Sequence, residues 1–113
     1  MNHIDIEIGG KKRTLRFGIK VIGDCIKHNN NDPQEFMVSL AQNPFDSLPL
    51  LFYYGLKYNV ERSGGTPDFD LFKVTEWLEE EGLQGEMVDE VTRRFMRSLY
   101  ENVPVIKELI DVQ

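Results

Sequence analysis

The sequence has little of the chemistry on which enzymes and metal sites depend. Its 113 residues include one cysteine and two histidines, His3 and His28, which lie far apart in the chain. A single cysteine cannot form an internal disulfide bond, and one cysteine with two separated histidines cannot close a zinc shell. We therefore expect no bound metal and no cofactor. Cys25 lies among apolar residues, and we interpret it as a small hydrophobic side chain.

Three short patterns resemble functional motifs, and each has a simpler structural interpretation. His28 follows Cys25 by about one helical turn, but no glycine-rich elbow accompanies the pair, which favours a structural cysteine. Residues 9–12, Gly-Gly-Lys-Lys, lack the spacing of a phosphate loop and link two predicted strands, which favours a hairpin turn. The acidic residues between positions 76 and 90 do not follow the calcium-loop pattern, so we interpret them as a solvated face. We predict that the chain is not an enzyme, and a hydrolase that uses Cys25 is the remaining enzymatic alternative.

The chain also lacks a long apolar run and an excess of positive charge. No window approaches the roughly 20 apolar residues of a transmembrane helix. Residues 1–7 are too acidic and too regularly alternating for a signal peptide. The net charge of −6 argues against general nucleic-acid binding, which needs many lysines and arginines. We predict a soluble, cytosolic chain with neither a membrane nor a nucleic acid as its partner.

Charge is unevenly distributed along the chain. Six of the 13 lysines and arginines lie in residues 1–28, and acidic residues dominate the remainder. We interpret this distribution as two solvated faces of opposite sign. The alternative is that copies of the chain pair through these faces, which would make the protein a homo-oligomer.

The residues that are present predict one domain of class α+β, mainly α. Residues 3–8 alternate apolar and polar side chains, and the alternation resumes over residues 13–17. The two glycines between these segments can form a tight turn, so a β-hairpin is expected. The single domain, 1–113, is predicted to have three parts: the hairpin at 1–17, a helical body at 18–103 and an apolar tail at 104–113.

Helical periodicity and capping signals place about five helices after the hairpin. Asp32 is the expected N-cap of one of them, with Pro33 at its first position and Glu35 reaching back as in a capping box. Pro49 is tolerable in the central helix because it is expected in the first turn. The predicted helices span about residues 18–28, 32–42, 47–60, 70–81 and 85–101.

The last two predicted helices are amphipathic, with apolar residues at helical spacing on one face. Trp77 lies beside the apolar face of the first of them. The predicted apolar stripes consist of Leu71, Val74 and Leu78 in the first helix and Val88, Val91, Phe95 and Leu99 in the second.

The helix predicted at about 47–60 holds the densest apolar and aromatic material in the chain, so we expect the other elements to pack around it. It carries Tyr53, Tyr54 and Tyr58. Tyrosine offers a large contact area with a polar tip, and it is enriched where protein surfaces meet. Two interpretations stay open: the rings belong to the core with hydroxyls at its rim, or they form a partly exposed patch for self-association or client binding.

Three segments together resemble a known family. Ile6–Phe17 has the form Ile-x-Ile-Gly-Gly-Lys-x-x-x-Leu-x-Phe, and Leu50–Tyr58 reads Leu-Leu-Phe-Tyr-Tyr-Gly-Leu-Lys-Tyr. Thr75–Glu81 is acidic and contains Glu-Trp-Leu-Glu-Glu. In this order the segments resemble the small tail assembly chaperones of long-tailed bacteriophages and of their prophage or gene-transfer-agent relatives. These are packing patterns and include no catalytic signature.

The resemblance implies a non-enzymatic protein of the bacterial host cytoplasm that is absent from the mature virion. Such chaperones bind the tape-measure protein and recruit tail-tube subunits. They are often oligomeric, and a longer frameshifted form can share the N-terminus. The expected partners are therefore the tape-measure protein, the tail-tube protein and further copies of the chain.

We hypothesise that aromatic and apolar residues from three helices line or flank a groove that covers an apolar helix of the tape-measure protein. The main alternative is a small cytosolic adaptor or regulatory protein of a mobile element, which binds one folded partner through its hairpin edge or its aromatic helix. The candidate protein-binding residues are Tyr53, Tyr54, Tyr58, Trp77, Val91, Phe95 and Leu99.

Overall fold

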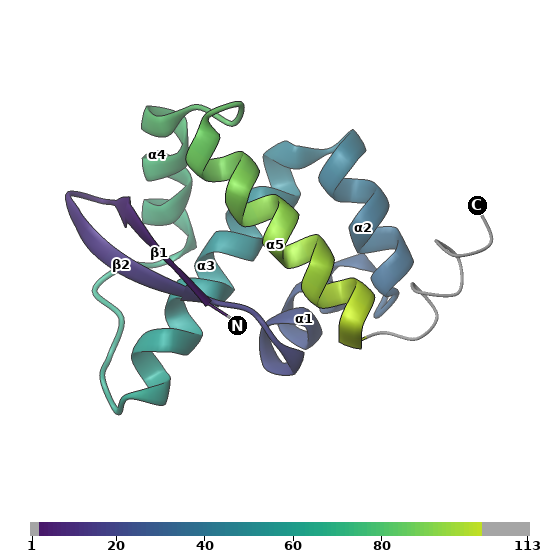
Figure 1. Cartoon of the computed structure of the whole chain (residues 1–113), viewed down its shortest axis with the longest axis horizontal. Helices are drawn as coiled ribbons and strands as arrows, with labels where there is room; N and C mark the ends of the chain where they lie inside the picture. The colour runs from purple at the N-terminus through teal and green to yellow at the C-terminus, as the bar shows by residue number, and fades with distance from the viewer. Residues whose placement is uncertain (1–2, 103–113) are drawn as a thin grey trace.

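The structure, a computed structural model, describes residues 3–102 and confirms the predicted class, α+β and mainly α (Figure 1). The predicted tail at 104–113 lies outside the described residues. A two-stranded antiparallel hairpin precedes the helices. The elements are β1 (His3–Ile8), β2 (Lys11–Arg16), α1 (Ile19–Ile26), the 3-10 helix η1 (Lys27–Asn29), α2 (Pro33–Gln42), α3 (Pro44–Arg62), α4 (Leu71–Glu81) and α5 (Glu86–Asn102).

The hairpin turns through two glycines with left-handed backbone. Ile8 pairs with Lys11, so Gly9 and Gly10 form a two-residue loop, with φ of 65° and 82°. Positive φ at both positions is typical of the turn that matches the twist of the flanking strands. The side chains of Ile8 and Leu15 are buried, so the apolar face of the hairpin lies against the helical body, as the alternation predicted.

Helix α3 is the element around which the others pack. Strand β2 and helices α1, α2 and α4 all contact it, and α5 crosses in front of it (Figure 1). Its side chains Leu51, Phe52 and Leu56 are at most 2% exposed. The prediction of a central helix is confirmed.

Helix α3 begins earlier than predicted. Pro44 is its first residue, after Asn43 as N-cap, so the helix starts three residues before Ser47. Proline fits this position because the missing N–H has no acceptor within the helix. Pro49 therefore lies in the second turn, and the prediction of a first-turn position was wrong. It cannot donate the hydrogen bond that the carbonyl of Phe45 would otherwise accept.

At the start of α2, the predicted N-cap is confirmed but the predicted capping box is wrong. Asp32 is the N-cap, and its Oδ1 accepts a hydrogen bond from the backbone N–H of Gln34 at 2.9 Å. Glu35 does not complete a capping box, because its carboxylate accepts a hydrogen bond from Nδ2 of Asn30 at 3.0 Å. The backbone N–H of Asp32 instead donates to the carbonyl of Asn29 at 2.9 Å, so it is not available to the Glu35 carboxylate.

Gly55 is a point of very close approach between α3 and β2. A Cβ atom at this position would lie 2.7 Å from Cδ2 of Leu15 and 2.9 Å from the carbonyl oxygen of Arg16. The Arg16 carbonyl belongs to the backbone and cannot turn aside as a side chain would. The hairpin therefore sits as close to α3 as it does because residue 55 has no side chain.

We predict that Gly55→Ala lowers the free energy of unfolding by about 1–3 kcal/mol, the range for an overpacked core. The matched control is Gly23→Ala in the middle of α1, where a Cβ meets nothing within 4 Å. This control should gain about 0.5–1 kcal/mol from its better helix propensity. Urea unfolding of both variants measures the difference, and an unchanged midpoint for Gly55→Ala would contradict the close approach.

Candidate protein-binding surface

Aromatic rings form a continuous strip from α3 to α4. The ring centroids of Tyr53 and Tyr54 are 5.2 Å apart, and those of Tyr53 and Phe69 are 6.3 Å apart. Phe69 continues the strip to Trp77, at 5.7 Å. These separations lie within the range of about 4.5–7 Å for favourable aromatic pairs. Tyr58, one turn further along α3, is half-buried against the core.

Tyr54 ends the strip beside η1. Its hydroxyl is hydrogen-bonded to Nε2 of His28 at 2.9 Å, and either group can be the donor. Burial, followed by the negative charge of Asp24, raises the pKa of the Tyr54 hydroxyl, so the group stays protonated at neutral pH. Lys57 lies over the same rings, with Nζ 5.7 Å from the Tyr53 centroid. This end of the strip is half-buried and polar at its rim.

Arg13 closes the other end of the strip. Its guanidinium carbon lies 4.4 Å from the Trp77 ring centroid, and Nη1 is 3.0 Å from Oδ1 of Asp68. Its Nε donates a hydrogen bond to the carbonyl of Ile8 at 3.0 Å. A side chain at Gly9 would overlap the Trp77 indole. Trp77 is therefore enclosed between the hairpin and α4, with 8% of its area exposed.

Three of the predicted binding residues belong to the core. Val91, Phe95 and Leu99 on α5 have no exposed area. The Phe95 ring packs against Phe17 and Phe36, with centroids 6.3 and 5.7 Å away. The apolar face of α5 thus covers the helical body and does not line an open groove in this structure. The seven predicted residues do not form one surface.

Apolar side chains are exposed where α4 lies beside the start of α3. Phe45 is 76% exposed, and Leu71, which shares the predicted apolar stripe with Val74 and Leu78, is 38% exposed. Two surface hollows adjoin here and share the lining residues Phe45, Pro49 and Thr75, and we describe the two together as one depression. We call it the α3–α4 groove. Its apolar lining consists of Phe45, Pro49, Leu50, Leu71, Leu78 and Leu83.

The groove and the aromatic strip share a border. His28, which holds the Tyr54 hydroxyl, also lines one end of the groove. Tyr54 does not line the groove itself and is linked to it only through His28. Sequence reasoning missed Phe45 because it started the helix at Ser47. The available signal was Asn43-Pro44, which can begin a helix as well as end one.

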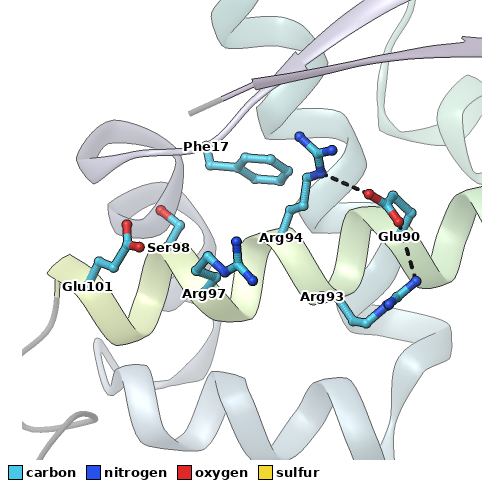
Figure 2. A pocket seen from close by; sticks show the side chains of 7 residues that line it. All are labelled: Phe17, Glu90, Arg93, Arg94, Arg97, Ser98 and Glu101. Carbon is cyan, nitrogen blue, oxygen red and sulfur yellow. Dashed lines mark hydrogen bonds and ion pairs between the residues drawn. The ribbon is translucent and has the colours of Figure 1, made fainter. Parts of the chain in front are cut away.

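A second depression, on the outer face of α5, is polar (Figure 2). Three arginines line it, and two of them reach the same carboxylate. Arg93 Nη2 lies 3.3 Å from Glu90, and Arg94 Nε lies 3.0 Å from it. Arg93 also pairs with Asp89 at 3.2 Å. Since local carboxylates offset much of this positive charge, we interpret the depression as the solvated face of α5.

The described residues offer little for catalysis or metal binding. Cys25 has no exposed area, and burial, followed by the charge of Asp24, raises the pKa of its thiol. Within residues 3–102, no group of three histidine, cysteine, aspartate or glutamate side chains is placed to hold a metal ion. In the same range, no helix is both long enough and apolar enough to cross a membrane.

Comparisons with known proteins add no assignment. The chain matches no protein-family model, no curated protein and no solved structure.

We predict that Cys25 is unreactive in the folded chain. A thiol without exposed area and with a raised pKa forms little accessible thiolate, which is the reactive species. Labelling with a chromogenic disulfide at pH 8 should be about a thousandfold or more slower in buffer than in urea, because unfolded fractions are ~10⁻³ or lower. Equal rates in the two solvents would show that the thiol is open and would restore Cys25 as a candidate nucleophile.

We predict a pH-dependent effect at Asp68. The hydrogen bond from Arg13, with the charges of Arg13 and Lys11, lowers the pKa of this carboxyl in the folded chain. A lowered folded-state pKa gives stability that is present above the unfolded value of about 3.9 and is lost as pH falls through the folded value. Asp68→Asn should therefore lower the melting temperature at pH 7, and its difference from the wild type should shrink at low pH, once the carboxyl is protonated in the folded chain.

The control for Asp68 is Glu61→Gln, an exposed carboxylate that forms no ion pair with the described residues. Its melting curve should follow the wild type at both pH values. A loss of stability in Asp68→Asn that persists at low pH would exclude the ion pair as its cause.

Proposed function

We propose that the chain is a non-enzymatic tail assembly chaperone of a long-tailed phage or prophage, which binds the tape-measure protein and helps to recruit tail-tube subunits. The observation that carries the proposal is the open α3–α4 groove. Phe45, 76% exposed, and Leu71 lie in the same depression, and apolar side chains gathered in a groove are typical of protein-binding sites. The proposed setting is the cytoplasm of the bacterial host, with the chain absent from the mature virion.

The three segments that carry the resemblance contact one another in the fold, which supports the proposal. Leu15 of the first segment lies against Gly55 of the second, and Gly9 and Arg13 of the first lie against Trp77 of the third. The three segments therefore pack as one unit. A pattern shared by one packed unit is a stronger basis for a resemblance than three patterns scattered over the fold.

The groove fits what a chaperone of a long helix needs. An amphipathic helix lays its apolar face into a groove, and its affinity depends on a few anchoring side chains. A groove with few anchoring side chains gives reversible binding, which a chaperone needs in order to release its client. Tyr54, beside His28, offers a polar edge at one end of the groove.

We predict that co-expression with the tape-measure protein raises its soluble fraction and that the two proteins co-purify. Tyr54→Ala/Tyr58→Ala should lower the retained tape-measure protein several-fold, because it removes the ring that His28 links to the groove and the ring beyond it. The circular dichroism spectrum of the variant checks that it stays folded. Equal retention by the wild type and a folded double variant would exclude these tyrosines from the client site.

Genome context distinguishes the proposal from the adaptor alternative. A tail-tube gene before this one and a very long tape-measure gene after it would favour the chaperone. A neighbourhood of regulatory genes would favour a protein that binds one folded partner through its hairpin edge or aromatic helix.

A further inference from the structure

The α3–α4 groove has the length of a helix-binding site. One wall is a single face of α4, because the residues that line it recur at i, i+4, i+7 and i+11. These residues are Leu71, Thr75 and Leu78, followed by Gly82, the C-cap at which α4 ends. The opposite wall is the start of α3, with Phe45 and Pro49. The 11 residues of α4 extend about 16 Å, which corresponds to about three turns of a partner helix.

The groove carries negative charge without a cationic partner among the described residues. Its ionisable lining residues are His28, Asp46 and Glu79, and within residues 3–102 its lining includes no lysine or arginine. Asp46 accepts a hydrogen bond from Nδ2 of Asn43 at 3.1 Å. Neither carboxylate has a described lysine or arginine nitrogen within 4.0 Å. Glu90 on α5, by contrast, pairs with two arginines.

We propose that the α3–α4 groove binds a positively charged amphipathic helix of about three turns. The apolar face of this helix lies against Phe45 and Leu71, and its lysines or arginines reach Asp46 and Glu79. Complementary charge directs the approach of such a partner and disfavours acidic helices. This inference rests on the proposed function for the identity of the client, and it narrows the client segment to a basic amphipathic stretch of the tape-measure protein.

A second copy of the chain is a poorer occupant. The chain has a net charge of −6, so a copy as a whole brings like charge toward the acidic groove. Basic residues are in excess only in residues 1–28, and four of them already pair with carboxylates: Lys11 and Arg13 with Asp68, and Lys20 and Lys27 with Asp24. On α5, where three arginines line one face, Arg93 and Arg94 already pair with Glu90. A client with unpaired lysines or arginines meets no such competition. Charge complementarity therefore favours a different, basic partner.

The test uses two synthetic peptides and the isotope-labelled full chain. Both peptides are stapled helices of about three turns with the same leucine face, and their polar faces carry either lysine or glutamate. We expect the lysine peptide to shift the backbone amide resonances of residues 45–48, 50 and 71–83, since Pro44 and Pro49 have no amide hydrogen. The glutamate peptide should bind about tenfold more weakly, which corresponds to about 1.4 kcal/mol.

Matched variants test the contacts. Phe45→Ala removes an exposed side chain of the groove and should weaken binding of the lysine peptide about tenfold. Ile19→Ala is the control, because Ile19 is 79% exposed but lies on α1, outside the groove lining. It should bind as the wild type does. Asp46→Asn/Glu79→Gln should bind the two peptides equally.

Three results would overturn the inference. Equal affinity of the wild type for the two peptides would remove the charge preference. Resonance shifts that cluster on Tyr53 and Phe69 and leave residues 71–83 unchanged would move the site to the aromatic strip. A dimer in sedimentation that dissociates on Phe45→Ala but not on Ile19→Ala would assign the groove to a second copy.

Co-expression with the tape-measure protein separates this inference from the proposed function. Retention by the wild type and loss by Phe45→Ala supports both. Equal retention by the wild type and Phe45→Ala removes the groove as the client site, and the chaperone proposal then depends on the retention itself and on the resemblance. A wild type that retains no tape-measure protein contradicts the proposed function. The peptide titration then tests independently whether the groove binds a basic helix.

Discussion

The contact of β2 with Gly55 is the constraint on which the rest of the structure depends. Leu15 and the carbonyl of Arg16 fill the space that a side chain at position 55 would occupy. This contact holds the hairpin on α3, and the hairpin in turn brings Arg13 and Gly9 against Trp77. A lone two-stranded hairpin is marginal in water, so its order derives from this support. Because Gly55 has no side chain, the hairpin can contact α3 and α4 at the same time.

The fold was predictable where local signals agree. Strict alternation, a two-glycine turn, a capping aspartate and the stripes of α4 and α5 each specify an element from a few neighbouring residues. The errors lie where one signal has two physical outcomes. Asn43-Pro44 can end one helix and begin the next at once, so α3 was predicted to start too late and Phe45 was missed. Asp32 had a backbone acceptor for its N–H, which left Glu35 free to bind Asn30.

The candidate site was less predictable than the fold. Periodicity shows that Val91, Phe95 and Leu99 share one face of a helix, but it does not show what covers that face. In the structure the core covers it. Leu71 is the opposite case. It shares a pattern with Val74 and Leu78, but it is the first residue of α4 and is not covered by the core. Exposure depends on tertiary packing, so it requires the three-dimensional structure.

Trp77 has a consequence for how the molecule can be observed. It is the single tryptophan of the chain, and it lies on the helix that also forms one wall of the α3–α4 groove. A cation lies against its ring and the hairpin glycine packs against it, so its emission depends on how α4 sits against the hairpin. Intrinsic fluorescence therefore reports a displacement of α4 against the hairpin without an added label, from a side chain that is 8% exposed and does not line the groove.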